Sequence, residues 1–194
     1  MDETLSALLD DLYAEGRAFD ATREDRLERR RNVEPDTAAL IAVLIRATRP
    51  ARVLELGTSN GYSTLWLAEA ARAVGAALVS VDVEPERTEQ ARANLTRGGL
   101  AGAVELRTED AADTLAASGD GEWGLIFLDA ERPAYVSYWP DLVRALAPGG
   151  LLVVDNVLSH AEQVADFRAL VAADDRVHEA LAPTGAGALL IVSG

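Results

Sequence analysis

Short apolar runs alternate with segments of helical periodicity from residue 52 to residue 193. The apolar runs predict strands, because runs of about four to eight residues bounded by turn-forming residues are too short for most helices. The predicted strands cover residues 52–56, 77–82, 104–107, 124–129, 151–155, 177–182 and 188–193. The segments between them predict helices over residues 65–73, 85–97, 111–117, 136–146 and 161–172.

This alternation predicts an α/β fold with a doubly wound, Rossmann-like sheet. Parallel strands that alternate with helices require right-handed crossovers, which place helices on both faces of the sheet. The runs LIFLD and LLVVD are apolar almost throughout, as expected of strands that are buried on both faces. The last two strands are joined by a hairpin-like connection at residues 183–187. We therefore expect seven mostly parallel strands with an antiparallel last strand.

The first 31 residues predict a helical N-terminal extension. Four leucines recur at helical spacing and predict an amphipathic helix over residues 2–15: Leu5, Leu8, Leu9 and Leu12. Residues 20–31 are charge-rich and form either a solvated helix or a mobile segment, and Pro35 opens the next helix. We expect one domain over residues 1–194. The leucine face of the extension either packs on that domain or forms a homodimer.

The composition excludes several classes of site. With 18 basic and 32 acidic residues the net charge is −14, which disfavours binding to nucleic-acid phosphates. Residues 26–31 (RLERRR) are the exception, either a solvated face balanced by neighbouring acids or a local basic patch. The chain has no cysteine, so thiolate metal sites and cysteine nucleophiles are excluded. No apolar run reaches membrane-spanning length and the N-terminus is acidic, so we expect a cytoplasmic protein.

A glycine turn follows the first predicted strand, in the sequence VLELGTSNGYS at residues 53–63. Glycines let backbone amides approach a ligand closely, and Asp82 at the end of the next strand is suited to accept hydrogen bonds from ribose hydroxyls. The spacing Gly57-x-x-x-Gly61 lacks the glycine pattern that holds a pyrophosphate, which disfavours a nicotinamide-dependent dehydrogenase. The turn suits a nucleoside cofactor without a pyrophosphate, and S-adenosylmethionine is the best candidate.

Acidic residues end or follow each of the first five predicted strands: Glu55, Asp82, Asp110, Asp129 and Asp155. Ligands of such sheets bind beyond the carboxyl ends of the strands. Asp129 and the pair Asp155-Asn156 follow strands that we expect to be adjacent, so their side-chain oxygens can converge on a divalent cation. Mg²⁺ is the best candidate, with Mn²⁺ and Ca²⁺ tolerated. Alternatively, Asp155 and Asn156 cap the next helix and Asp129 pairs with an arginine.

Four segments resemble, in order, the motifs of the cation-dependent class I O-methyltransferases, the family of catechol and caffeoyl-CoA O-methyltransferases: VLELGTSNGYSTLWLA, SVDVEPER, LIFLDAERPAY and APGGLLVVDNVLSH. The resemblance runs from about residue 32 to the C-terminus. It implies that the cofactor contacts Val33, Glu55, Gly57, Ser59, Ser63, Asp82, Asp110, Ala111 and Asp129. It also implies that Asp129, Asp155 and Asn156 are the metal ligands.

The resemblance also reveals a departure at Arg132. Many family members carry a lysine there, three positions after the first metal aspartate, and use it as the general base. All 18 basic residues of this chain are arginine, and a guanidinium does not give up its proton at neutral pH. Arg132 is therefore expected to stabilise an anionic oxygen rather than accept a proton. Asp129 is the other expected catalytic residue. His160 is an alternative base or a helix-start residue, and Tyr135 is either a motif residue or part of the core.

The reaction expected from these features is metal-dependent methyl transfer from S-adenosylmethionine to a hydroxyl oxygen of a small vicinal diol, such as a catechol. Two alternatives remain: methylation of a hydroxylated wobble uridine in transfer RNA, and a catalytically weak homologue that only binds the cofactor. The short connection at residues 183–187 leaves the acceptor site either open or completed by a partner subunit.

Overall fold

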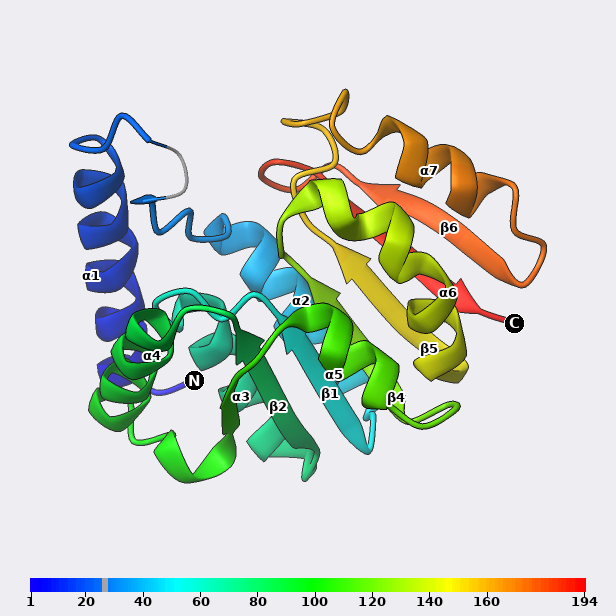
Figure 1. The fold of residues 1–194 in the computed structure, drawn as a ribbon. Coiled ribbons are helices and arrows are strands. Elements are labelled where there is room, and N and C mark those ends of the chain that lie inside the picture. Colours follow the sequence, from blue (N-terminus) through cyan, green and yellow to red (C-terminus); the bar gives the residue numbers. More distant parts are fainter. Residues whose placement is uncertain (26–27) are drawn as a thin grey trace.

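The computed structural model describes residues 1–25 and 28–194, and Figure 1 shows its fold. Seven strands form one sheet in the order β3-β2-β1-β4-β5-β7-β6. They are β1 (Arg52–Leu56), β2 (Ala77–Asp82), β3 (Glu105–Thr108), β4 (Trp123–Leu128), β5 (Leu146–Val154), β6 (Val177–Ala182) and β7 (Ala188–Ser193). The pairs among β1 to β5 are parallel, and β7 is antiparallel to both of its neighbours. The predicted mostly parallel sheet with an antiparallel last strand is confirmed.

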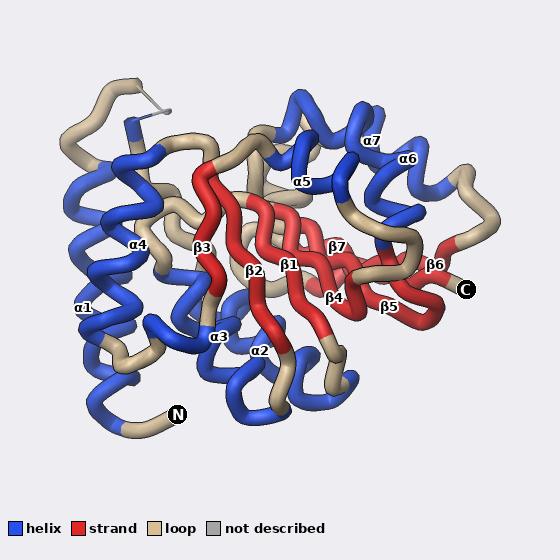
Figure 2. Tube along the Cα trace, turned by 60° about the horizontal axis from the view of Figure 1, so that its bottom comes forward, coloured by secondary structure: helices blue, strands red, loops and turns tan. Residues whose placement is uncertain are grey.

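Helices cover both faces of the sheet, as predicted. They are α1 (Glu3–Asp20), α2 (Pro35–Thr48), α3 (Tyr62–Val74), α4 (Pro85–Arg97), α5 (Ala111–Ala117), α6 (Tyr135–Ala145) and α7 (Ala165–Ala172). Figure 2 shows α5, α6 and α7 on one face and α2 and α3 on the other, with α1 beside α4. Two short 3-10 helices, η2 (Ala101–Ala103) and η3 (Arg132–Ala134), lie in the connections.

The central strands send alternate side chains into two apolar cores. On β4, Leu125 and Phe127 belong to the core that also contains residues of α1, α2 and α3, whereas Ile126 and Leu128 belong to the core beneath α5, α6 and α7. This two-sided burial explains why the predicted strands are apolar at nearly every position.

Several boundaries differ from the prediction: α1 continues to Asp20 instead of residue 15, and α3 begins at Tyr62 instead of residue 65. At β5 and α7 the difference arises because tertiary contacts replace the local pattern. β5 begins at Leu146 instead of residue 151, since the chain passes directly from α6 into the strand. The residues up to Gly150 form an irregularity, in which Trp123 pairs with Leu146 and Leu125 with Leu151. α7 begins at Ala165 instead of residue 161, because the preceding residues form turns whose amides bond to the loop before β7.

The leucine face of α1 packs on its own domain. Asp2 caps the helix by accepting a hydrogen bond from the Leu5 amide at 2.8 Å. Leu5, Leu9 and Leu12 are buried in the same core as α2 and α3. Intramolecular packing therefore accounts for the apolar face, and homodimer formation stays a prediction.

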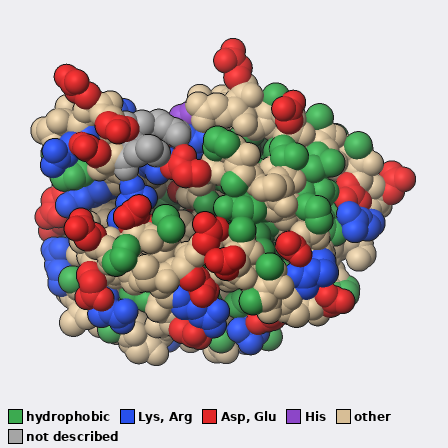
Figure 3. All heavy atoms as spheres, viewed as in Figure 1, with side chains coloured by type: hydrophobic (Ala, Val, Ile, Leu, Met, Phe, Trp, Pro, Cys, Tyr) green, Lys and Arg blue, Asp and Glu red, His purple; other side chains and the backbone are tan. Residues whose placement is uncertain are grey.

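The charge-rich segment after α1 is described only in part. Arg26 and Leu27, and with them part of the predicted basic run, lie outside the described residues. Residues 21–25 form turns and bends rather than a solvated helix. In the view of Figure 3, acidic side chains and arginines are interspersed around α1 and α4 rather than gathered into one basic surface.

No helix within residues 1–25 and 28–194 is long and apolar enough to cross a membrane.

Candidate functional site

A cavity of about 370 Å³ lies at the carboxyl ends of β1, β2 and β4, where the strand order reverses. Most residues predicted for the site line this cavity: Val33, Gly57, Ser59, Ser63, Asp82, Asp110, Ala111, Asp129, Arg132 and Asn156. His160 also lines it. Glu55, Asp155 and Tyr135 are buried behind the lining. Ligands of doubly wound sheets commonly bind at such a switch point, where the connections after β1 and β4 lead to helices on opposite faces of the sheet.

The glycine turn after β1 contacts both β2 and the loop after β4, which border the cavity. Gly57 has φ +109°, and a side chain at this position would place its Cβ 2.3 Å from the backbone oxygen of Asp129. The amide nitrogens of Gly57 and Thr58 both donate to the backbone oxygen of Val81, at 2.9 and 3.1 Å. The turn after β1 is therefore packed directly against the loop after β4 and needs a residue without a side chain.

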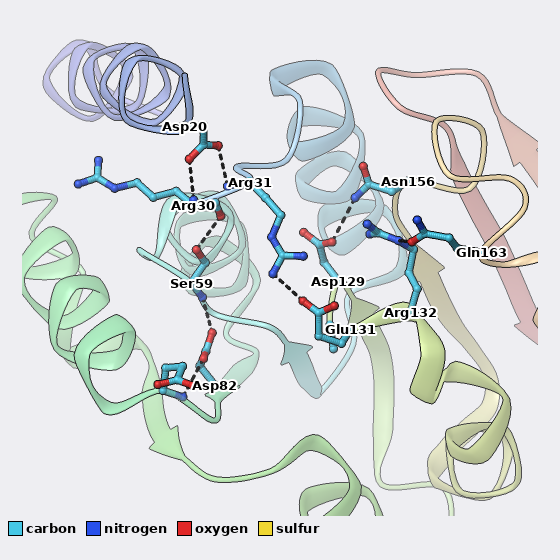
Figure 4. A network of polar contacts seen from close by, with 12 residues as sticks. Asp20, Arg30, Arg31, Ser59, Asp82, Asp129, Glu131, Arg132, Asn156 and Gln163 are labelled. Atoms are coloured by element: carbon cyan, nitrogen blue, oxygen red, sulfur yellow. Dashed lines mark hydrogen bonds and ion pairs between the residues drawn. The ribbon is translucent and has the colours of Figure 1, made fainter. Parts of the chain in front are cut away.

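Asp82 orders the glycine turn and faces the cavity. Its Oδ2 accepts a hydrogen bond from the Ser59 amide at 2.8 Å, and its Oδ1 accepts one from the Glu84 amide at 3.0 Å. Ser59 has φ +49°, and its hydroxyl donates to the backbone oxygen of Arg30 at 2.8 Å. Figure 4 shows this chain of contacts from Asp82 through Ser59 to the N-terminal segment. A carboxylate accepts several hydrogen bonds, so Asp82 retains capacity for a ligand hydroxyl.

Glu55 is buried behind the cavity lining and holds lining residues in position through hydrogen bonds. Its carboxylate accepts hydrogen bonds from the hydroxyls of Ser63, Thr64 and Ser80 at 2.5, 2.5 and 2.6 Å. Burial raises the pKa of Glu55 to about 7, although each of these hydroxyls lowers it. The side chain fixes the first turn of α3 and orients Ser63, which does line the cavity. The contact of Glu55 with the cofactor that the resemblance implies would thus be indirect.

The free energy of unfolding should depend on pH through Glu55. Between pH 4.5 and about 7 the folded protein holds a proton that the unfolded chain has released, so stability falls as pH rises through this window. Glu55→Gln lacks this titration. The decrease in its free energy of unfolding between about pH 5 and pH 8 should therefore be roughly 2–3 kcal/mol smaller than the decrease in the wild type. Urea unfolding of the wild type and of Glu55→Gln at both pH values measures this difference. Equal drops in the two proteins would show that Glu55 titrates normally.

Asp129 and Asp155 lie side by side because of the strand register. Leu128 pairs with Val154, and each aspartate directly follows one member of this pair. The amide of Asp155 donates to the backbone oxygen of Leu128 at 3.2 Å. Asn156, with φ +67°, turns its side chain back so that Nδ2 donates to Asp129 Oδ1 at 3.2 Å and Asp155 Oδ2 at 2.9 Å. The three predicted ligands therefore converge on one point, and Figure 4 shows the side chain of Asn156 turned toward Asp129.

The charges at this point are poorly compensated by protein groups. Burial, and then repulsion from Asp155, holds the pKa of Asp129 well above its usual range. Burial likewise raises the pKa of Asp155, and the Oδ1 atom of Asp155 is buried with no hydrogen-bond partner within the described structure. A divalent cation would offset both effects, since it stabilises the charged form of each carboxylate.

The donor set fits a hard cation. Two carboxylates and one amide supply oxygen atoms, and the amide presents oxygen instead of nitrogen after a half-turn. Within residues 1–25 and 28–194 there is no cluster of three or more His, Cys, Asp and Glu side chains suited to a metal. The candidate set is thus a two-carboxylate site completed by Asn156.

The alternative interpretation of these residues is wrong. α7 begins at Ala165 with Val164 at its N-cap, so neither Asp155 nor Asn156 caps it. Among the described residues no arginine lies within ion-pairing distance of Asp129. Asp110 does act as a cap, because its Oδ1 accepts from the Ala112 amide at 2.7 Å at the start of α5.

Arg132 brings a buried positive charge to the Asp129 side of the cavity. It lies in η3 and is 4% exposed, and its Nε donates to Gln163 Oε1 at 2.9 Å. His160 is not at the start of α7 but in the turns before it, with Nδ1 2.8 Å from the Ser159 hydroxyl. Tyr135 is a core residue, as one of its two interpretations stated, and its hydroxyl donates to the backbone oxygen of Ala130 at 3.0 Å.

Sequence reasoning missed Arg31 and Glu131, which also line the cavity. Nη2 of Arg31 lies 2.7 Å from Oε1 of Glu131. Arg31 belongs to a charged run that the sequence assigned to solvent or to a basic patch. Its approach to the cavity depends on a backbone with φ +52°, for which the sequence carries no signal at arginine.

Comparisons with known proteins identify the family. The profile of the O-methyltransferase family matches residues 5–193. A catechol O-methyltransferase of Niastella koreensis is 35% identical over 130 residues, covering 66% of this chain and 58% of the relative. A catechol O-methyltransferase of Mycobacterium tuberculosis is 37% identical over 126 residues, covering 65% of this chain and 57% of the relative. The matches thus span less than two thirds of the length of these two relatives.

The fold agrees with this match. The structure of the O-methyltransferase TomG from Streptomyces achromogenes, solved in complex with SAM, superimposes with a TM-score of 0.77 at 28% identity. That alignment covers 100% of this chain and 90% of TomG. The chain belongs to the O-methyltransferase family, which confirms the resemblance of its motifs.

Proposed function

We propose that this protein transfers a methyl group from S-adenosylmethionine to a hydroxyl oxygen of a small vicinal diol and requires a divalent cation. One observation carries the proposal: a single cavity joins a nucleoside-type half at Asp82 to an oxygen-donor half at Asp129, and Gly57 packs the two together. The catechol O-methyltransferases among the relatives support a diol acceptor.

The cofactor half would bind through groups that already point into the cavity. Asp82 would accept hydrogen bonds from the ribose hydroxyls, and Ser63, whose hydroxyl donates its hydrogen to Glu55, would lie near the methionine portion. Val33 would contribute a backbone contact to the methionine portion. Asp110 and Ala111, at the start of α5, would border the adenine.

On the other side Asp129, Asp155 and Asn156 would hold Mg²⁺. When bound, S-adenosylmethionine supplies an electrophilic methyl group, and the divalent cation makes a neighbouring hydroxyl more acidic. The guanidinium of Arg132 would stabilise the resulting negative charge without taking the proton. His160 lines the same cavity and is the candidate acceptor of that proton. The fixed positions of these groups would align the acceptor oxygen with the donor.

Removal of divalent cations should abolish the activity. We expect methylation of catechol or a hydroxycinnamoyl ester by labelled S-adenosylmethionine with Mg²⁺, and no turnover above background after treatment with EDTA. Restoring Mg²⁺ should restore the rate, with S-adenosylmethionine binding measured by calorimetry as the control for folding. Full activity in EDTA would contradict the proposed metal dependence.

Transfer RNA is not the acceptor that we favour. The described arginines of the basic run, Arg29, Arg30 and Arg31, line the cavity, and the net charge of −14 opposes binding to phosphates. Binding of transfer RNA that weakens steeply with salt would support the alternative. Cofactor binding with no transfer to any diol would support a catalytically weak homologue.

A further inference from the structure

Arg31 is held in the cavity by contacts on both sides of its backbone. The carboxylate of Asp20, at the end of α1, accepts hydrogen bonds from the amides of Arg30 and Arg31 at 2.7 and 2.9 Å. The backbone oxygen of Arg30 accepts a hydrogen bond from the Ser59 hydroxyl at 2.8 Å. These contacts fix the left-handed backbone of Arg31 and project its side chain between the glycine turn and Asp129 (Figure 4).

The Arg31 guanidinium lies where the two halves of the cavity meet. Its Nη2 contacts Glu131 Oε1 at 2.7 Å, with 28% of the Arg31 side chain and 43% of the Glu131 side chain exposed. Within the described structure this is the hydrogen bond that its side chain makes, and it uses one of five N–H donors.

The ion pair is not needed to hold the N-terminal segment in place. A partly exposed pair contributes little stability, at most about 1 kcal/mol, and Asp20 and Ser59 already fix the backbone. The cavity wall carries many carboxylates, among them Asp82, Asp129 and Glu131. The wall also carries arginines, and Arg132 is already assigned to the reacting oxygen, so the guanidinium of Arg31 is suited to a further negative charge on the acceptor.

We propose that Arg31 selects diol acceptors that carry a carboxylate, such as dihydroxybenzoate-type acids, by donating hydrogen bonds to that carboxylate. The inference rests on the proposed methyl transfer and narrows its acceptor class. Glu131 holds the guanidinium through Nη2, so other N–H groups of the fork remain to bind the acid. Arg31 is thus a specificity-determining residue that touches the acceptor and not the cofactor.

The test compares 3,4-dihydroxybenzoate with 3,4-dihydroxybenzamide, which has the same shape but no charge. The wild type should prefer the acid in kcat/KM by about tenfold or more. Arg31→Met should lower kcat/KM for the acid by about 10–100-fold and for the amide by less than about twofold. Arg97→Met removes an equal charge from the exposed end of α4 and should leave the preference unchanged.

Binding supplies a readout that does not depend on turnover. Calorimetric titration with S-adenosylhomocysteine and Mg²⁺ present should show the acid binding about 10–100-fold more weakly to Arg31→Met, with unchanged affinity for S-adenosylhomocysteine. Equal kcat/KM for acid and amide in the wild type would overturn the inference and leave methyl transfer intact. If neither compound is methylated but the acid still binds in an Arg31-dependent manner, the proposed function fails while the specificity of the site stands.

Discussion

Asp155→Ala should reduce Mg²⁺-dependent methyl transfer by roughly a thousandfold or more, because it removes one of two carboxylates that would hold the cation. The carboxylate is 2% exposed, and its Oδ1 has no hydrogen-bond partner among the described residues. Its Oδ2 accepts a hydrogen bond from the neighbouring Asn156, a small structural contribution, so its loss should affect function more than folding. Initial rates with saturating S-adenosylmethionine and Mg²⁺ measure the effect, and calorimetry measures Mg²⁺ affinity.

Two controls separate the metal half of the cavity from the cofactor half. Asp155→Ala should retain its affinity for S-adenosylmethionine and unfold at no lower temperature than the wild type, since burial of its charge is unfavourable. Asp82→Ala should lose cofactor affinity and keep Mg²⁺ binding. A full methylation rate in Asp155→Ala would refute the assignment of the metal ligands.

Gly57→Ala should lower the free energy of unfolding by about 3 kcal/mol or more and eliminate methyl transfer. The new Cβ would lie 2.3 Å from the backbone oxygen and 2.8 Å from the backbone carbon of Asp129, atoms that cannot move without shifting β4. The backbone at φ +109° is also strained for any residue with a side chain. Urea unfolding at one pH gives the change in stability, and the Mg²⁺-dependent rate gives the change in function.

Gly75→Ala is the matched control for this substitution. Gly75 also has a positive φ, +76°, but nothing lies within 4 Å of its Cβ position. We expect only the cost of the left-handed backbone there, about 1–2 kcal/mol, with the methylation rate preserved. Equal effects of the two substitutions would show that backbone strain, and not contact between the turn and Asp129, explains the importance of Gly57.

The elements of the fold were largely predictable because the chain alternates so regularly. β1, β2, α4, β6 and β7 have the predicted bounds. The prediction failed where the backbone hydrogen bonds come from distant segments, as at β5 and before α7. Local periodicity reports which face of an element is apolar, but it does not report where a remote carbonyl ends a helix.

The site was predictable in its residue types more than in its arrangement. Asp82, Asp129 and Asn156 were expected to face a ligand because they follow strands, and parallel strands end at one edge. Glu55 was assigned to the cofactor by its motif, yet its carboxylate is enclosed by three hydroxyls. Arg31 had no motif, and a fold-dependent backbone conformation brings it to the cavity.

The sequence by itself determined the order of strands and helices, the glycine turn, the oxygen donors after β4 and β5, and the lack of any lysine base. Only the tertiary structure decided that Leu128 pairs with Val154, which puts Asp129 beside Asp155, and that Arg31 reaches the same cavity. The physical reason is that periodicity and turn chemistry act over a few neighbouring residues. Register, burial and charge compensation depend on segments that meet only when the chain is folded.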